Sequence, residues 1–197
     1  PGASVTVKGQ RLGFDYGRLF TKRDIDRVLA DWLTMPGPRL PSDAYARLDY
    51  HPHDHHYTAR RPGVDGERPL GAHGTSVMEI AVGGCRSAGH LSSGDDRDDD
   101  PIVRGVAPNA DIVFVQVRTH GNGRKALDVN DVVDAVAFIF HFADSVGKAC
   151  VVNLSLNTMS GPHDGDGYFE RRLASLLRSG SAGPEIRGRA IVVAAGN

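Results

Sequence analysis

The sequence predicts an α/β fold in which a mainly parallel sheet is flanked by helices, giving three layers. Two observations support this. Apolar, strand-like segments at 112–117, 149–154 and 190–195 alternate with helical patterns at 130–146 and 168–177. The order strand, helix, strand, helix, strand favours right-handed crossovers, which place successive strands parallel in one sheet. Ligands of such sheets bind beyond the carboxyl ends of the strands.

The first 70 residues contain one clear helical pattern. A capping box with Asp24 in place of Glu starts at Thr21. Apolar residues then recur at helical spacing, at Ile25, Val28, Leu29, Trp32 and Leu33. The cluster Pro36-Gly37-Pro38 ends the helix, and residues 39–70 show no period and are predicted to form a surface loop. We therefore divide the chain into an irregular N-terminal region, 1–70, and a core, 71–197.

The core begins with a short helix just after His73. We expect Val77, Ile80 and Ala81 to face inward and Gly83-Gly84 to end this helix. Residues 87–101 are predicted to form a loop. The apolar segment 112–117 then predicts a mostly buried strand.

The remaining elements complete the alternating pattern. Asn130 is the expected cap of a helix that Gly147 ends, and one face of it is apolar: Val132, Val133, Val136, Ala137, Phe140 and Ala143. A buried strand is expected at 149–154. The helix at 168–177 should end near Gly180, and the last apolar strand follows at 190–195.

Composition excludes several functional classes. The formal net charge is −1, from 23 Lys and Arg against 24 Asp and Glu. This balance offers no bulk attraction to nucleic acid or to an anionic membrane, so neither is predicted as a partner. No apolar run approaches the ~20 residues that cross a bilayer. The start at Pro1 lacks a signal-peptide pattern and an initiator Met, so we expect a chain that is processed or excised from a longer one.

Several possible metal ligands and nucleophiles lie outside the core motifs. Cys85 and Cys150 lie in apolar settings and are predicted to be buried thiols. The run His51–His56 has donors suited to zinc or nickel, and Asp95–Asp100 has oxygen ligands suited to calcium. A solvated loop is favoured for both, so no metal site or cofactor is predicted, with calcium as the alternative. A dinucleotide cofactor is disfavoured because no Gly-x-Gly-x-x-Gly follows a strand.

Four segments, in order, carry a family resemblance. They are Ala72-His73-Gly74-Thr75-Ser76-Val77, Gly105-Val106-Ala107-Pro108-Asn109-Ala110, Val152-Asn153-Leu154-Ser155-Leu156 and Val192-Val193-Ala194-Ala195-Gly196-Asn197. Together they resemble the subtilisin-like serine proteases (subtilases, peptidase family S8) over residues 70–197. The segment from Gly13 to Leu29 also resembles an insertion of some bacterial subtilases. The resemblance implies a subtilisin-like fold of Rossmann-like topology, here truncated.

The resemblance implies an endopeptidase that hydrolyses polypeptides through an acyl-enzyme. His73 would be the general base, which takes the proton of a serine hydroxyl and returns it to the leaving amine. Imidazole suits this role because its ordinary pKa lies near neutral pH. Asn197 would donate its side-chain amide to the oxyanion of the tetrahedral intermediate.

The resemblance also assigns residues that bind substrate. Ala194, Ala195 and Gly196 would line the pocket for the residue before the cut. Ser155, Leu156 and Asn157 would form the edge that pairs with extended substrate by strand addition.

Two departures from the family pattern stand out. The family usually has Gly where this chain has Asn157. It prefers small residues where the helix after His73 has Met78-Glu79, so Glu79 needs solvent or a partner.

Two members of the catalytic triad are missing or doubtful. The family carries its serine in a Gly-Thr-Ser-Met-Ala type segment well beyond the oxyanion asparagine. The given sequence ends at Asn197 and contains no such segment. Ser76 belongs to the His73 motif. Asp15, in Asp15-Tyr16-Gly17, is a weak candidate for the aspartate and Asp49 a weaker one, so the true aspartate is expected before Pro1.

We therefore expect a protease domain by descent that is inactive as this fragment. The alternative is a catalytically dead subtilase-like module that holds peptides or a partner protein. A Rossmann-like nucleotide binder is disfavoured. Secretion is suggested only by the resemblance, and the compartment is left open. Exposed strand edges of a truncated sheet predict self-association.

Overall fold

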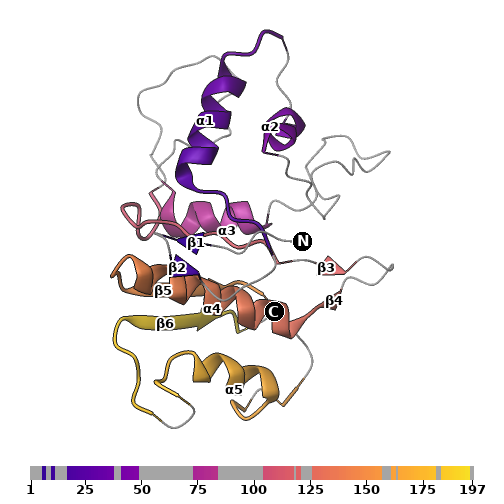
Figure 1. Cartoon of the computed structure of the whole chain (residues 1–197). Helices are drawn as coiled ribbons and strands as arrows, with labels where there is room; N and C mark the ends of the chain where they lie inside the picture. Colours follow the sequence, from indigo (N-terminus) through magenta and orange to yellow (C-terminus); the bar gives the residue numbers. More distant parts are fainter. Residues whose placement is uncertain are drawn as a thin grey trace, which may run out of the picture. The chain divides into compact units, whose positions relative to one another are not determined.

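A computed structural model of the chain (Figure 1) describes residues 6, 7, 10, 11, 17–37, 41–48, 73–83, 104–117, 119, 120, 126–156, 161, 162, 164–180 and 183–195. Contacts divide the chain into two units. Unit 1 comprises Pro1–Asp54, Val117–Asn153 and Thr158–Val192. Unit 2 comprises His55–Gln116, Leu154–Asn157 and Val193–Asn197.

Helix α1 (Lys22–Leu33) begins at the capping box that the sequence predicts. The backbone N–H of Asp24 donates to the Thr21 hydroxyl at 3.3 Å, and the backbone N–H of Thr21 donates to the Asp24 carboxylate at 3.0 Å. Two backbone donors of the first turn are thereby satisfied by side chains. Before this helix, strands β1 (Thr6–Val7) and β2 (Gln10–Arg11) form an antiparallel pair.

The capping box predicts an acid-sensitive α1. The Thr21 hydroxyl and then its backbone N–H, both donating to the carboxylate, hold the pKa of Asp24 below its ordinary value of 3.8. When folding lowers the pKa of a carboxyl group, the ionised group stabilises the folded state, and this contribution is complete above the pKa of the unfolded state. The contribution is lost as the pH falls through the pKa of the folded state. Between pH 6 and pH 2 the urea midpoint of the wild type should therefore fall further than that of Asp24→Asn. Asp26→Asn, on the same helix, is the control and should follow the wild type; parallel curves for wild type and Asp24→Asn would contradict the prediction.

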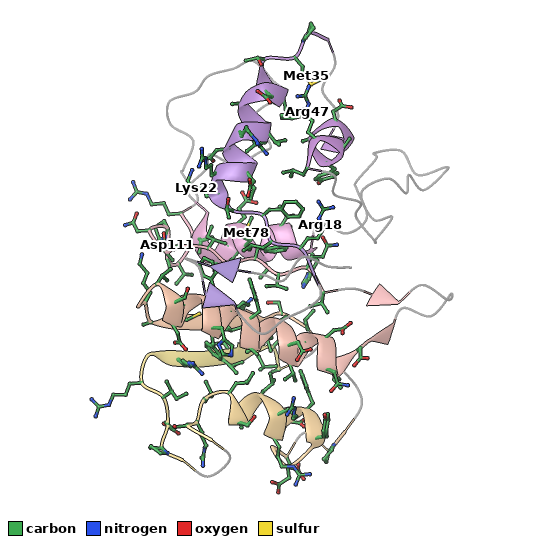
Figure 2. The ribbon with its side chains drawn as sticks, in the orientation of Figure 1. Arg18, Lys22, Met35, Arg47, Met78 and Asp111 are labelled. Carbon is green, nitrogen blue, oxygen red and sulfur yellow. The ribbon has the colours of Figure 1, made fainter. Side chains whose placement is uncertain are left out.

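Helix α2 (Pro41–Arg47) corrects the prediction of a loop over residues 39–70. Seven residues are too few for a 3.6-residue period to stand out, and the overlooked signals were local: Pro at the first helical position, Asp43 in the first turn and Arg47 in the last. Helices α1 and α2 pack side by side (Figure 1). Arg47 reaches across to Asp31 at 3.7 Å and to the Met35 sulfur at 3.3 Å (Figure 2).

Helix α3 (His73–Val82) begins at the predicted place. Of its three predicted inward residues, Val77 and Ala81 are half-buried, whereas the prediction for Ile80 is wrong. No side chain of α3 is buried, and Ile80 is 68% exposed. At its carboxyl end this helix accepts backbone hydrogen bonds from residues 105–107. Periodicity therefore identified the helix and not its packing partner.

The segment 112–117, predicted as a buried strand, is not part of any ladder among the described residues. It keeps the two-residue alternation of a strand, because Val113, Val115 and Val117 are half-buried while Ile112 and Phe114 are exposed. A strand also needs a hydrogen-bonded neighbour, which the pattern cannot supply. Strands β3 (Thr119–His120) and β4 (Ala126–Leu127) follow as an antiparallel pair.

Helix α4 (Val129–Ser145) carries most of the buried core. Its cap is Asp128, not the predicted Asn130, because the Asp128 carboxylate accepts the Asn130 N–H at 2.8 Å. Five of the six predicted core residues are buried: Val132, Val133, Val136, Phe140 and Ala143. After the helix, Gly147 has a φ of 69°, and the N–H groups of Gly147 and Lys148 donate back to Asp144 and Ala143. This Schellman ending explains why glycine is required there.

Strands β5 (Cys150–Leu154) and β6 (Arg189–Val193) form the predicted parallel pair. The Cys150 N–H donates to the Gly188 carbonyl at 2.7 Å and the Ala194 N–H to the Leu154 carbonyl at 3.1 Å, so both strands run in the same direction. Helix α5 (Tyr168–Ser175) lies between them in sequence and packs on α4. It is two residues shorter than predicted, since residues 176–178 continue with i→i+3 bonds. Burial of β5 is one-sided: Val152 and Leu154 are buried, and Val151 is 69% exposed.

Arg189, the first residue of β6, ties this strand to both helices. Its guanidinium donates to the Leu176 carbonyl at 2.7 Å, pairs with the Asp144 carboxylate and lies 4.9 Å from the centre of the Phe140 ring. The Arg189 side chain is only 14% exposed, whereas that of Asp144 is 49% exposed. One cation thus bridges α4, the end of α5 and β6.

Replacing Arg189 by alanine should therefore destabilise the chain by about 2 kcal/mol. This value lies below the range for breaking a fully buried pair, because the freed Asp144 is half exposed and can be hydrated. The exposed Arg187→Ala is the matched control and should change the free energy of unfolding by less than about 0.5 kcal/mol. Equal urea midpoints for the two variants would show that the bridge contributes nothing.

Candidate active site

His73 is the first residue of α3, and its ring contacts the chain just after β5. The His73 Nε2 lies 2.9 Å from the backbone carbonyl oxygen of Ser155, a residue 82 positions away in sequence. Both residues belong to unit 2.

Ser155 lies beyond the carboxyl end of the β5–β6 pair. The bond from the Ala194 N–H to the Leu154 carbonyl closes the pair at this end. Past this end the chain continues with Ser155 and Leu156 after β5 and with Ala194 and Ala195 after β6. Ligands of parallel sheets bind at this end of the strands. Ala194 and Ala195 are exposed, Leu156 is 39% exposed and Ser155 is half-buried. The structure thus brings His73 to Ser155, and Leu154 connects Ser155 to Ala194.

The segment 105–107 closes the carboxyl end of α3. The N–H of Gly105 donates to the Gly83 carbonyl at 2.6 Å, that of Val106 to Ile80 at 3.1 Å and that of Ala107 to Ala81 at 2.8 Å. The last carbonyls of a helix have no partner within it. Here successive amides of another segment satisfy two of them, those of Ile80 and Ala81, and also the carbonyl of Gly83, which follows the helix. Two of the motifs from the sequence thereby fit together: one supplies His73 and the other holds its helix.

Two glycines explain how closely these segments approach. A Cβ on Gly105, which is buried, would lie 2.5 Å from the Gly83 nitrogen and 2.7 Å from the Val82 nitrogen. A Cβ on Gly74 would lie 3.2 Å from Cζ of Phe114. Gly74 lets Phe114 approach the helix closely, a contact that the sequence does not reveal, because it predicts a buried strand at 112–117.

The unusual pair Met78-Glu79 fits without a buried charge. Met78 is half-buried and Glu79 is exposed, so the Glu79 carboxylate keeps its hydration. Met78 is labelled on α3 in Figure 2. Met78 and Glu79, which stand where the family prefers small residues, therefore bury no charge in the helix that carries His73.

Cys150 is the free cysteine of the described residues, and it is half-buried. Burial raises the pKa of its thiol, while Arg189 nearby lowers it by less. A raised pKa reduces the thiolate fraction at neutral pH, so Cys150 is a poor nucleophile.

Several residues singled out in the sequence lie outside the described residues. They are Asp15, Asp49, Cys85, Asn157, Gly196, Asn197 and the runs His51–His56 and Asp95–Asp100. Among the residues that the structure does describe, no three His, Cys, Asp or Glu side chains gather as a metal site. No helix in this part of the chain is both long and apolar enough to traverse a bilayer.

Comparison with known proteins identifies one family. A sequence model of the subtilase family (Peptidase S8) matches residues 29–197, which is well over half of the chain. Searches of curated proteins and of solved structures found no match. The family implies an α/β fold, in agreement with the helices and the two-stranded parallel sheet seen here. The motif residues, the contact of His73 with Ser155 and the family match agree, and the chain therefore belongs to the subtilase family of serine peptidases.

Proposed function

We propose that this chain provides the base and the substrate-binding edge of a serine endopeptidase that works through an acyl-enzyme. The observation that supports it is the contact between His73 and Ser155 at the carboxyl end of the parallel strands. His73 takes the proton of the attacking serine and returns it to the leaving amine. The substrates are polypeptides, as the family implies.

The remaining site residues follow the family motifs. Asn197 donates its side-chain amide to the oxyanion. Ala194, Ala195 and Gly196 form a pocket wall of small residues. Ser155, Leu156 and Asn157 pair with extended substrate by strand addition. The exposure of Ala194 and Ala195 is compatible with this role.

The finer architecture is part of the same proposal. We assign residues 71–197 to a partial catalytic core with a three-layer arrangement and residues 1–70 to an N-terminal insertion. Self-association of the 197-residue chain also stays a prediction, supported by exposed apolar side chains such as Ile80 and Val151.

The 197 residues alone should show no peptidase turnover. They contain no Gly-Thr-Ser-Met-Ala type segment, and Ser76 lies on α3 itself, three residues after His73. A base without a nucleophile has nothing to activate. A fluorophosphonate probe, which reacts covalently with an activated serine, should therefore leave this chain unlabelled and label the protein expressed from its full reading frame.

The same probe distinguishes the proposed endopeptidase from the alternative, a catalytically dead module that holds peptides. No described residue favours that alternative, since Glu79 is exposed and Met78 is half-buried on α3. Absence of labelling in the full-length protein, with peptide binding retained, would overturn the proposed endopeptidase. Labelling of the 197-residue chain would overturn its predicted inactivity.

A further inference from the structure

Arg47, the last residue of α2, contacts the carboxyl end of α1 through a methionine and a carboxylate. Its Nη2 donates to the Met35 sulfur at 3.3 Å, and its Nη1 lies 3.7 Å from the Asp31 carboxylate (Figure 2). Both contacts are weak, because a thioether is a poor hydrogen-bond acceptor and 3.7 Å is longer than a hydrogen bond. Both helices belong to unit 1, so this contact lies within one compact part of the chain.

Met35 lies where an oxygen atom can be added without entering the core. It follows the cap residue Thr34 and precedes Pro36 and Gly37, and all three of these neighbours are exposed. Met35 itself is half-buried, whereas the buried side chain of α1 is Val28. Oxidation of a methionine disrupts packing when it places a polar group among apolar ones. At this position the added oxygen meets solvent and a cation instead.

We propose that Met35 is a site of oxidation by hydrogen peroxide, and that its sulfoxide oxygen then accepts a hydrogen bond from Arg47 that fastens α2 to the end of α1. In the reaction a sulfur lone pair forms a bond to one peroxide oxygen as the O–O bond breaks. The departing oxygen keeps the electron pair of that bond, takes the proton of the transferred hydroxyl and leaves as water. Sulfur is oxidised and the peroxide is reduced.

The sulfoxide is a better partner for Arg47 than the thioether. Its oxygen carries a partial negative charge, and a hydrogen bond with a charged donor is roughly twice as strong as one between neutral groups. The methionine side chain is unbranched and flexible, so the oxygen can turn toward the guanidinium while the backbone stays in place. Oxidation at Met35 therefore strengthens the α1–α2 contact, the reverse of its usual effect.

Hydrogen exchange of the whole 197-residue chain, followed by mass spectrometry of its peptides, tests the site and its effect together. The sequence contains three methionines, and Met78→Leu with Met159→Leu leaves Met35 as the single one. After peroxide treatment the Met35 peptide should gain the mass of one oxygen atom. The amides of α2 should then exchange about fivefold more slowly, because a charged donor strengthens the new bond while exposure to water limits the gain.

Four variants in the same background make the result specific. Met35→Leu shows what peroxide does to all other residues, the cysteines included, and should gain no protection. Arg47→Ala lacks the donor and should gain none on oxidation, whereas Arg27→Ala, which removes an exposed arginine of α1, should keep the full gain. Met35→Gln carries an amide oxygen in place of the sulfoxide oxygen and should show the protection without peroxide.

The outcomes that would overturn the proposal are distinct. A Met35 that peroxide leaves unoxidised would remove the modification site. Unchanged or faster exchange of α2 after oxidation, or the same slowing in Arg47→Ala, would remove the role of Arg47. The measurement follows exchange in α2 and no peptide hydrolysis, so these results leave the proposed endopeptidase untouched.

Discussion

Replacing His73 by alanine should lower kcat for peptide hydrolysis by about 10⁶-fold in the protein expressed from its full reading frame. This magnitude is the effect of removing the triad histidine from subtilisin itself and is not set by the present structure. The expected cause is loss of the only group that takes the serine proton, since His73 lies at the carboxyl end of the β5–β6 pair against Ser155.

The loss should fall on kcat and not on KM. A residue that acts on the reacting atoms stabilises the transition state, so its removal lowers kcat without weakening uniform substrate binding. We therefore expect KM to be unchanged, measured by steady-state hydrolysis of a chromogenic peptide.

The matched control is another exposed histidine, His141 on α4, which belongs to unit 1. His141→Ala should keep full hydrolysis and full fluorophosphonate labelling. Equal labelling of the wild type and of His73→Ala would remove His73 from the mechanism.

Gly105→Ala should destabilise the chain by about 3 kcal/mol. The new Cβ would lie 2.5 Å from the Gly83 nitrogen and 2.7 Å from that of Val82. These are backbone atoms at the end of α3, so the clash is relieved only by moving the helix away from residues 105–107. Overpacking of a well-packed site costs about 1–3 kcal/mol, and the hydrogen bonds that residues 105–107 donate to α3 and to Gly83 add to the loss.

Two graded controls make the Gly105 prediction specific. Gly74→Ala places its Cβ 3.2 Å from the tip of the Phe114 ring, an exposed side chain that can shift, so a smaller loss is expected. Val106→Ala alters a side chain that is 89% exposed and should change stability by less than about 0.5 kcal/mol. Urea denaturation should rank the losses Gly105, Gly74, Val106. A Gly105→Ala variant as stable as Val106→Ala would show that the segment does not hold α3.

Elements whose signals are local were predicted well. The Thr21–Asp24 capping box starts α1 as expected, and Gly147 ends α4 with positive φ as expected. Both signals act within one turn of the chain, where the sequence contains every atom involved. The cap of α4 was predicted two residues too late. Asp and Asn are both good caps, and only the geometry shows that Asp128 accepts the hydrogen bond from the Asn130 N–H.

Elements whose identity depends on a partner were predicted less well. The alternation of residues 112–117 describes a chain that can form a strand, yet pairing requires a neighbour that no local pattern names. For the same reason the apolar residues of α3 did not reveal that Ile80 would be exposed. The motif residues themselves were found, but their contacts were not: Phe114 against Gly74, and residues 105–107 against the end of α3.

By itself the sequence determined the family, the order of the principal helices and strands, and the identity of His73 as the residue to test. These follow from motif order and from periodicity, which are properties of the chain read in one dimension. Tertiary structure alone decided that Ser155, 82 residues further on, meets the His73 ring through Nε2. That contact depends on where β5 ends relative to α3, and such long-range geometry arises only when hydrogen bonds and packing bring distant segments together.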